Sequence, residues 1–292
     1  MITASSCVKE PDACVIVGNH VTFGALLPAP GSDSTVRTKE DSDIFQAAQA
    51  INAGDHKGLD LRQNRDFRFY PAEGDSDTLE AVVARYSELV SKFGADNVQV
   101  LCSKKATGSG VRAVNARLRE LMNPRSEGKD EVDIYGETFR VGDRVMCTKN
   151  NKDIVRNGEV GKVIAVDKAK RSLVVSYGPD RSVTHSGVMA SKLMHAWATT
   201  IHSSQGSEYD GVITVAAKSH SNMLNRKLLF TGITRGKKQS DLVGEEQVIR
   251  ESVRRPGVRR KCLLGQAIAT LQGQPVAKLK DLRSELLASP PK

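Results

Sequence analysis

Residues 196–210 place a run of hydrogen-bonding side chains directly after a short apolar stretch, in the order Ala-Trp-Ala-Thr-Thr-Ile-His-Ser-Ser-Gln-Gly-Ser-Glu-Tyr-Asp. The apolar start predicts a strand that delivers Thr200 and His202 to its carboxyl end, where open α/β sheets bind ligands. Hydroxyl, amide and backbone N–H groups suit contacts to phosphate and sugar. The stretch therefore indicates a binding loop, although an ordinary strand-to-helix turn capped by a serine has the same composition.

A second stretch, residues 225–238, combines an apolar helical face with an arginine at the end of the helix. Its leucines and Ile233 can face a core, so Thr234 and Arg235 are expected at the helix end, close to the sheet. The planar guanidinium of an arginine at such a place can bind a phosphate, as an arginine finger does. A surface arginine before a basic turn would explain the same residues.

Helices and strands that alternate along the chain must position these stretches. The pattern predicts helices over 41–52, 78–93, 110–122 and 223–231, and strands over 13–18, 97–102, 196–201, 211–216 and 240–244. Residues 55–77 are polar and poorly periodic, and no element is predicted there. Such alternation predicts a parallel sheet with helices on its faces.

The pattern changes between residues 134 and 192, where short valine-rich stretches predict strands. These strands are expected over 139–149, 159–167 and 171–177, and Asn157-Gly158 is the strongest hairpin signal in the chain. We therefore expect a small, barrel-like all-β module, called the β-module below, inserted in a loop of the α/β domain.

Composition excludes several classes of protein. The chain has 292 residues, 39% hydrophobic and 26% charged, which suits a globular protein of about two domains. It contains no run of about 18 apolar residues, and its start lacks the basic and apolar parts of a signal peptide. The five cysteines form no C-x-x-C pair, which argues against a disulfide framework or zinc site and predicts a reducing cytoplasm.

The formal net charge of +9 is concentrated in the last quarter of the chain. Residues 221–292 hold 15 Lys and Arg against 6 Asp and Glu, whereas the rest is balanced. A basic cluster between Arg254 and Lys261 predicts a polyanionic partner, most simply nucleic acid. A solvated helix face followed by a basic tail would give the same composition.

The 196–210 and 225–238 stretches resemble motifs V and VI of superfamily 1 DNA helicases in the RecD-like branch, in the family's order and spacing. The β-module is similar to the SH3-like barrel inserted in the second motor domain of that branch. Residues 98–124 resemble motif IV and its helix, and residues 37–54 resemble the stretch between the two motors. The resemblance covers roughly residues 34–250.

The resemblance implies an α/β fold, a RecA-like parallel sheet interrupted by an SH3-like barrel. It also implies a division of the chain into a remnant of the first motor and a linker (1–33), an inter-motor helix and linker (34–77), the second motor domain in two parts (78–133 and 193–250), the barrel (134–192) and a basic tail (251–292).

Roles for single residues follow from the same resemblance. Arg235 would be the catalytic arginine finger for the γ-phosphate, with nucleotide contacts from Arg37, Gln205, Gly206 and Glu208. Single-stranded DNA would be bound by Thr200, His202, Ser203, Lys104, Lys105, Asn115, Lys149 and Asn150. ATP and Mg²⁺ are the implied cofactors, and no metal ligand is expected from this chain. The implied partners are single-stranded DNA and a motor subunit that carries the Walker motifs. Family members couple ATP hydrolysis to 5′-to-3′ movement along one strand, and the resemblance associates the chain with DNA repair and recombination.

The chain departs from the family where the nucleotide is held. No G-x-x-x-x-G-K-[ST] sequence occurs, and no acidic pair ends an apolar strand, so the phosphate cradle and the Mg²⁺ ligands are missing. Asn19 and Thr22 stand where motif III carries aspartate and glutamine, and Ser203 replaces the usual lysine of motif V. An arginine finger needs those parts, so we expect weak or absent ATPase activity from this chain alone.

Several functions remain open at this point. The chain could be the second motor of a RecD-like, ATP-dependent helicase completed by a separately encoded first motor, or the product of a split or decaying helicase gene. It could instead bind single-stranded DNA without hydrolysis, mainly through phosphates, because aromatic residues make up only 4% of it. The β-module could also bind protein, with Lys149–Lys152 a solvated hairpin tip. His195 and His220 are expected to be structural.

Overall fold

The computed structural model describes residues 16–17, 20–21, 42–62, 65–150 and 154–257. The chain divides into two units, one made of residues 1–36 and 258–292 and the other of residues 37–257. In the first unit, β1 (Ile16–Val17) and β2 (His20–Val21) form an antiparallel pair. Of the strand predicted over 13–18, only Ile16 and Val17 lie within the described residues.

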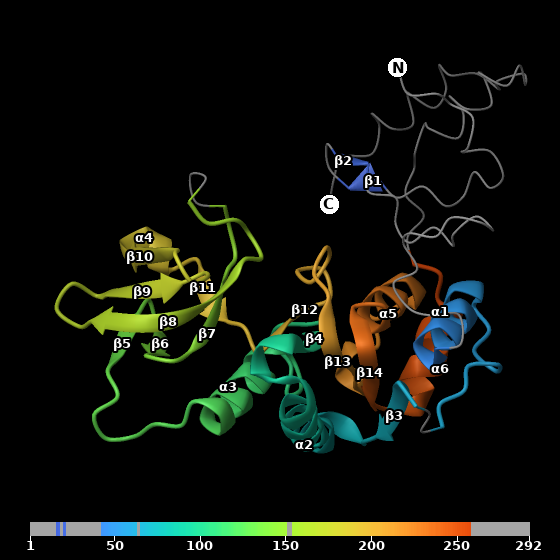
Figure 1. The fold of residues 1–292 in the computed structure, drawn as a ribbon. Helices are drawn as coiled ribbons and strands as arrows, with labels where there is room; N and C mark the ends of the chain where they lie inside the picture. The colour runs from blue at the N-terminus through green and yellow to red at the C-terminus, as the bar shows by residue number, and fades with distance from the viewer. Residues whose placement is uncertain (1–15, 18–19, 22–41, 63–64, 151–153, 258–292) are drawn as a thin grey trace, which may run out of the picture. The chain divides into compact units, whose positions relative to one another are not determined.

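Five parallel strands form the sheet of the second unit (Figure 1). Their order across the sheet is β12 (Ala198–Thr200), β4 (Val98–Cys102), β13 (Tyr209–Ala216), β14 (Gly236–Gly244) and β3 (Phe67–Pro71). Every residue of β4 is buried, as is typical of a parallel strand covered on both faces. The predicted fold class, an α/β parallel sheet with helices, is confirmed.

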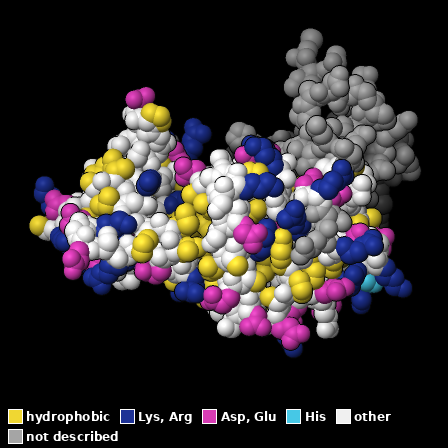
Figure 2. Space-filling model, turned by 60° about the horizontal axis from the view of Figure 1, so that its bottom comes forward, with side chains coloured by type: hydrophobic (Ala, Val, Ile, Leu, Met, Phe, Trp, Pro, Cys, Tyr) yellow, Lys and Arg dark blue, Asp and Glu magenta, His cyan; other side chains and the backbone are white. Residues whose placement is uncertain are grey.

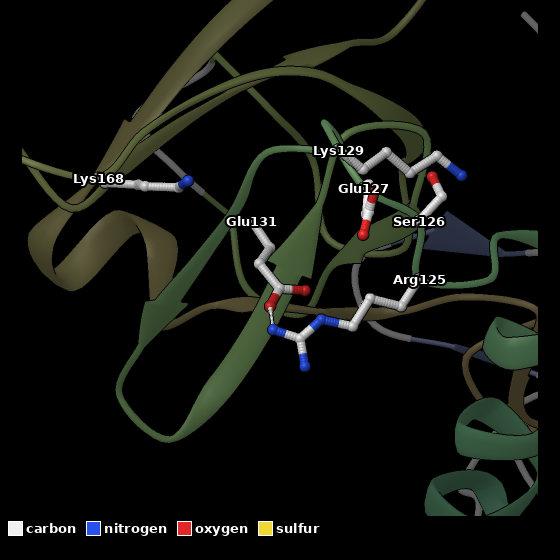
Figure 3. A pocket seen from close by; sticks show the side chains of 6 residues that line it. All are labelled: Arg125, Ser126, Glu127, Lys129, Glu131 and Lys168. Carbon is white, nitrogen blue, oxygen red and sulfur yellow. Dashed lines mark ion pairs between the residues drawn. The ribbon is translucent and has the colours of Figure 1, made fainter.

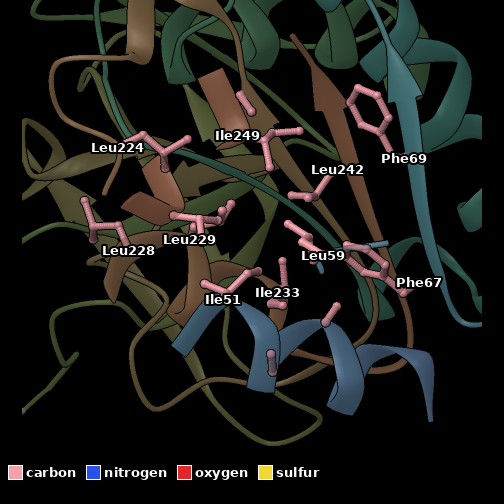
Figure 4. Packing of buried hydrophobic residues seen from close by; sticks show 14 of the residues in the cluster. Ile51, Leu59, Phe67, Phe69, Leu224, Leu228, Leu229, Ile233, Leu242 and Ile249 are labelled. Atoms are coloured by element: carbon pink, nitrogen blue, oxygen red, sulfur yellow. The ribbon is translucent and has the colours of Figure 1, made fainter. Parts of the chain in front are cut away.

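Helices cover both faces of this sheet. On one face, α1 (Asp43–Ala53), α5 (Arg226–Ile233) and α6 (Glu246–Arg254) enclose a core that includes Ile51, Phe67 and Leu229 (Figure 4). On the other face, α2 (Gly74–Phe93) and α3 (Val111–Met122) pack around Tyr86, Leu118 and the single tryptophan, Trp197. Two short 3₁₀ turns, η1 (Ala95–Asn97) and η2 (Lys218–His220), lie in the same part of the chain, which we call the sheet unit: residues 37–257 without the β-module.

Local signals explain why α1 begins and ends where it does. Ser42 is its N-cap residue, but the cap bonds come from Asp66, whose Oδ1 accepts the N–H of Asp43 at 2.8 Å and whose Oδ2 accepts the Ser42 hydroxyl at 2.6 Å. Gly54 ends the helix in the left-handed conformation, with φ at 79°, which glycine adopts without strain. The predicted helix over 41–52 is confirmed with a shift of one or two residues.

Two elements of the sheet unit were not predicted. Strand β3 lies inside the polar stretch 55–77, where only Phe67 and Phe69 alternate as buried residues, and pairing with β14 decides its conformation. Helix α6 occupies residues assigned in part to the basic tail 251–292, and it buries Val248, Ile249 and Val253 against α5 and its neighbours. The sheet unit therefore extends beyond the predicted boundaries at both ends.

The β-module spans Glu131–His195. β5 (Glu131–Ile134) pairs with β6 (Glu137–Arg140), and a five-stranded antiparallel sheet follows the order β10 (Ser182–Ser186), β9 (Ser172–Ser176), β8 (Val160–Asp167), β7 (Arg144–Cys147) and β11 (Leu193–His195), with α4 (Gly187–Ala190) before β11. The strand predicted over 139–149 is broken by a turn at Gly142, whose φ is 94°. Asn157-Gly158 does turn between β7 and β8, inside a longer connection than a two-residue hairpin.

In the described part of the chain, no helix has both the length and the apolar character needed to cross a membrane.

Candidate nucleic-acid and nucleotide site

The 201–208 loop joins opposite ends of the parallel sheet. It leaves β12 at Thr200, which pairs with Cys102 at the carboxyl end of β4. It enters β13 at Tyr209, whose N–H donates to the carbonyl of Arg235 at 2.9 Å. Ile201 anchors the loop in the core under α5. One short loop therefore runs from the carboxyl end of the sheet to its amino end.

Hydroxyl bonds fix the backbone where the 201–208 loop begins. Thr200 Oγ1 accepts the N–H of Ser203 at 3.1 Å and lies 2.8 Å from the Ser203 hydroxyl. The buried Ser204 donates its hydroxyl to the Ile201 carbonyl at 2.8 Å. His202 and Ser203 remain exposed, so the turn presents an imidazole and a hydroxyl to solvent on a fixed backbone.

Arg235 lies at the other end of the loop. Its Nη1 donates to the Ser207 carbonyl at 3.3 Å, and its Nε donates to the Thr231 carbonyl at 3.2 Å. The residue is 8% exposed and stands between the end of α5 and the start of β14. Gly206, with φ at 91°, and Glu208 are exposed next to this contact. The predicted neighbourhood of an arginine and a loop is therefore present, at the amino end of the sheet.

The β-module contributes a second loop to the surface beside Ser203. A Cβ on Gly158 would lie 3.7 Å from the Ser203 carbonyl oxygen, so the Asn157-Gly158 turn approaches the 201–208 loop closely. Asn150 Oδ1 accepts the N–H of Asn157 at 2.8 Å and fixes this turn. Lys149 and Asn150 are exposed there. Five of the residues predicted to bind DNA thus share one region: Thr200, His202, Ser203, Lys149 and Asn150.

A polar cluster at the carboxyl ends of β4 and β13 was not predicted. Asp75 Oδ1 accepts the hydroxyls of Ser109 at 2.5 Å and Ser219 at 2.6 Å, and His220 Nε2 lies 2.9 Å from Thr107 Oγ1. Burial lowers the pKa of His220 to about 4, and Lys104 adds to this while Asp75 opposes it. His220 is therefore neutral near pH 7.

The cluster contains serine, histidine and aspartate, but its geometry does not suit a nucleophile. Ser109 and His220 are fully buried, so no substrate reaches the hydroxyl. Asp75 bonds the serine, whereas the aspartate of a hydrolytic triad orients the histidine through Nδ1. The cluster is structural, as predicted for His220. The residues of the cluster come from three segments far apart in sequence, so no local pattern could have revealed them.

Comparisons with known proteins bear on residues 114–243. Residues 114–177 match the ATP-dependent RecD-like DNA helicase SH3 domain, and residues 195–243 match the UvrD-like helicase C-terminal domain. The RecBCD enzyme subunit RecD of Mycobacterium tuberculosis is 27% identical over 231 residues, which cover 74% of this chain and 39% of that protein. Residues 114–177 and 195–243 thus match the C-terminal region of RecD-like helicases.

A second sequence relative of this helicase region carries a helicase name. The ATP-dependent RecD2 DNA helicase of Deinococcus radiodurans is 34% identical over 156 residues, covering 52% of this chain and 21% of the relative. The chain spans less than half the length of these curated relatives. A structure described as Bacteroides Pif1 bound to ssDNA aligns with a TM-score of 0.45 at 16% identity, over 82% of this chain and 56% of that one.

Two residues predicted to bind DNA have bonds inside the fold: for Asn115 the prediction is wrong, and for Lys104 it stays a prediction. Asn115 is 5% exposed and bridges α3 to β12: its Nδ2 donates to the carbonyls of His195 and Ala198, and its Oδ1 accepts the N–H of Ala198. A side chain with these bonds holds the sheet together and does not reach DNA. Lys104 directs its ammonium to the Ser219 carbonyl at 2.6 Å, which leaves the exposed Lys105 as the cation of that loop.

The remaining predicted residues fall into three groups. Gln205, Gly206 and Glu208 are exposed on the 201–208 loop, in agreement with a surface site. Arg37 lies outside the described residues, as do Arg259, Arg260 and Lys261 of the basic cluster. His195 is structural as predicted, since its Nε2 lies 3.2 Å from Asp143 and its ring stacks on Trp197.

An open hollow on the connection between α3 and β5 has a charged lining that is largely paired (Figure 3). Arg125 bonds Glu131 at 2.6 Å, and Lys129 donates to Asn123 at 2.5 Å. Figure 2 shows Lys, Arg, Asp and Glu side chains spread together over one face of the molecule. These features add no second candidate site.

Proposed function

We propose that this chain binds single-stranded DNA through phosphate contacts along the carboxyl ends of β4 and β12 and the adjacent turn of the β-module. The observation that carries the proposal is the approach of the Asn157-Gly158 turn to Ser203. Asn150 bonds Asn157 within this turn, so Lys149 and Asn150 belong to a segment that approaches Ser203, although about fifty residues separate them in sequence. The name of the Deinococcus radiodurans relative, a DNA helicase, supports the same substrate class.

Charge and hydrogen bonding dominate this proposed surface. Lys105 and Lys149 are exposed cations, and Ser203, Thr200 and Asn150 carry hydroxyl or amide groups that suit phosphate oxygens. Among the residues proposed for this surface, His202 is the one whose side chain is a ring on which a base could stack. Affinity that rests on phosphate neutralisation falls steeply with salt, because each lysine that binds DNA releases counterions.

We expect Lys149→Gln to weaken binding of a labelled single-stranded oligonucleotide roughly threefold to tenfold at low salt, and to reduce the slope of log K against log salt by about 0.7. Ser203→Lys, which restores a cation at the motif V position, should strengthen binding and steepen the slope by a similar amount. Fluorescence anisotropy across a salt series measures both effects.

Lys57→Gln is the matched control for this experiment. Lys57 is an exposed lysine after α1, and its loss removes the same charge from another part of the sheet unit. The affinity of Lys57→Gln for the oligonucleotide, and its slope of log K against log salt, should equal those of the wild type. Binding that does not change with salt, or an equal loss in the control, would contradict the phosphate-contact proposal.

Arg235 supports a second candidate function, contact with the terminal phosphate of a nucleotide held by another motor domain. The residues of this chain do not fit Mg²⁺-bound ATP by themselves. The sequence has no phosphate cradle, and the described residues include no group of three His, Cys, Asp or Glu side chains that could hold a metal ion. We therefore derive no hydrolytic step from these residues, and Arg235 would act only on a nucleotide bound elsewhere.

The ATP proposal gives a direct expectation for the chain alone. ATP turnover with single-stranded DNA present should equal the protein-free blank, and Arg235→Ala should leave it there. A coupled phosphate-release assay measures the turnover. A rate well above the blank that Arg235→Ala abolishes would show that this chain holds a complete site.

A further inference from the structure

Asp75 joins three segments that all leave the carboxyl end of the sheet. It lies in the first turn of α2, where the helix dipole favours a negative charge. Its Oδ1 accepts the Ser109 hydroxyl, from the 103–110 loop after β4, at 2.5 Å. The same oxygen accepts the Ser219 hydroxyl, from the segment after β13, at 2.6 Å. One carboxylate oxygen thus ties α2 to both loops.

Backbone packing on Asp75 is equally close. A Cβ on Gly108 would lie 2.8 Å from Asp75 Cβ and 3.0 Å from its Oδ2, so no side chain fits between loop and carboxylate. Burial by itself would raise the pKa of Asp75, but the hydroxyls of Ser109 and Ser219, His220 and the Gly108 N–H outweigh it and keep the pKa below its usual range. The Asp75 carboxylate is therefore ionised at neutral pH and accepts the hydroxyl bonds of Ser109 and Ser219.

Further bonds hold the same two loops. Lys104 Nζ donates to the Ser219 carbonyl at 2.6 Å, and Thr107 pairs with His220 at 2.9 Å. The carbonyl of Lys105 accepts the N–H of Arg112 in the first turn of α3 at 3.1 Å. The backbone of the 103–110 loop is thus held at several points, while the Lys105 side chain remains exposed.

We propose that Asp75 is a positioning residue for single-strand binding: its carboxylate holds the 103–110 loop so that Lys105 meets a phosphate of the bound strand. The proposal rests on the proposed DNA-binding function. A lysine on an unfixed loop would lose conformational freedom on binding, whereas a fixed backbone leaves only the side chain to be ordered. Asp75 itself does not touch the DNA.

Two measurements on the full chain test this role. In Asp75→Ala, we expect oligonucleotide affinity to fall about as far as in Lys105→Gln, roughly threefold to tenfold, and adding Lys105→Gln to Asp75→Ala should cost less than about twofold more. Hydrogen exchange should become at least about tenfold faster at amides of residues 107–111 and 218–221. Asp75→Asn keeps one acceptor oxygen and should recover most of both properties.

Asp77→Asn is the matched control, because Asp77 is an exposed acid in the same helical turn. Asp77→Asn should change neither the hydrogen exchange of the two loops nor the affinity for the oligonucleotide. If Asp75→Ala does not fold, Gly108→Ala displaces the loop from the same carboxylate and should show the same pattern.

The outcomes separate this proposal from the function on which it rests. Unchanged exchange in Asp75→Ala overturns the positioning role. Faster exchange with unchanged affinity also overturns it, and the DNA-binding proposal then survives only if Lys105→Gln and Lys149→Gln weaken binding in the wild-type background. Loss of affinity together with faster exchange, absent from the Asp77→Asn control, supports Asp75 as the residue that positions Lys105.

Discussion

Replacing Asp143 by asparagine is expected to lower the free energy of unfolding by about 3–5 kcal/mol, because it removes a buried negative charge and leaves the Arg119 guanidinium without its counter-charge. The Asp143 side chain is fully buried between α3 and the β-module. It accepts bonds from Asn123 Nδ2 at 2.7 Å and the Arg140 N–H at 2.9 Å, and it lies 3.0 Å from Arg119 Nε and 3.2 Å from His195 Nε2. Arg119 would be left as an uncompensated, nearly buried cation.

The stability loss in Asp143→Asn should depend on pH, because the pKa of Asp143 is lowered in the folded protein. Burial would raise the pKa of Asp143, but His195, Asn123 and the charge of Arg119 together lower it. A carboxyl whose pKa is lower in the folded state stabilises the protein above its unfolded pKa of about 3.9 and loses that contribution as pH falls through the folded value. The difference between wild type and Asp143→Asn should therefore be full near pH 7 and shrink in acid.

Urea unfolding followed by tryptophan fluorescence measures this change. Trp197 is the single tryptophan, is 3% exposed, and stacks on His195 at a ring distance of 5.7 Å, so it reports on this junction. Asp180→Asn, at an exposed acid of the same β-module, should cost less than about 0.5 kcal/mol. A loss below about 1 kcal/mol for Asp143→Asn would show that the network contributes little.

Replacing Arg85 by methionine is the second change with a large expected effect, again about 3–5 kcal/mol near pH 8. Asp241 on β14 is fully buried, and Arg85 approaches its Oδ2 with Nε at 3.1 Å and Nη2 at 3.0 Å. The guanidinium also covers the ring of Tyr70, 4.1 Å from its centre. Without Arg85, the buried Asp241 carboxylate loses its bidentate guanidinium partner, while Gln239 Nε2 still donates to its Oδ1 at 3.1 Å.

Asp241 gives this variant a distinct pH profile. Burial already raises the pKa of Asp241, although Gln239 and Arg85 oppose the shift, and losing Arg85 raises it further. A carboxyl with a raised folded pKa destabilises the protein as pH rises from its unfolded pKa toward the folded one. Arg85→Met should therefore lose less stability at pH 5 than at pH 8.

Urea unfolding at both pH values tests the profile. Adding Asp241→Leu should recover most of the loss, since an apolar pair of similar size can replace a buried ion pair. Arg117→Met is the control: Arg117 pairs with Glu80 on the surface, and its loss should cost less than about 0.5 kcal/mol. An equal loss at the two pH values would contradict a buried, titrating Asp241.

Local patterns predicted those elements whose ends carry their own signals. Helix α2 ends before Gly94, and α3 ends shortly before Pro124, because glycine and proline stop a helix. Strand β3 lacked such signals. In β3, Arg68 lies between Phe67 and Phe69, and pairing with β14 makes the segment a strand. Helix α6 carries them although it was not predicted: Val248, Ile249 and Val253 recur at helical spacing on its buried face, and Pro256 follows its end.

Residue types at fixed spacing were sufficient to predict the α/β fold class, the inserted β-module and the resemblance to motifs V and VI. The contacts between residues distant in sequence could be seen only in the folded protein. The tertiary structure placed His202 and Arg235 at opposite ends of one loop, converted Asn115 into a bridge between α3 and β12, and gathered Asp75, Ser109, Ser219 and His220 at one edge. The physical reason is that contacts between distant segments depend on strand order and register, which local periodicity does not encode.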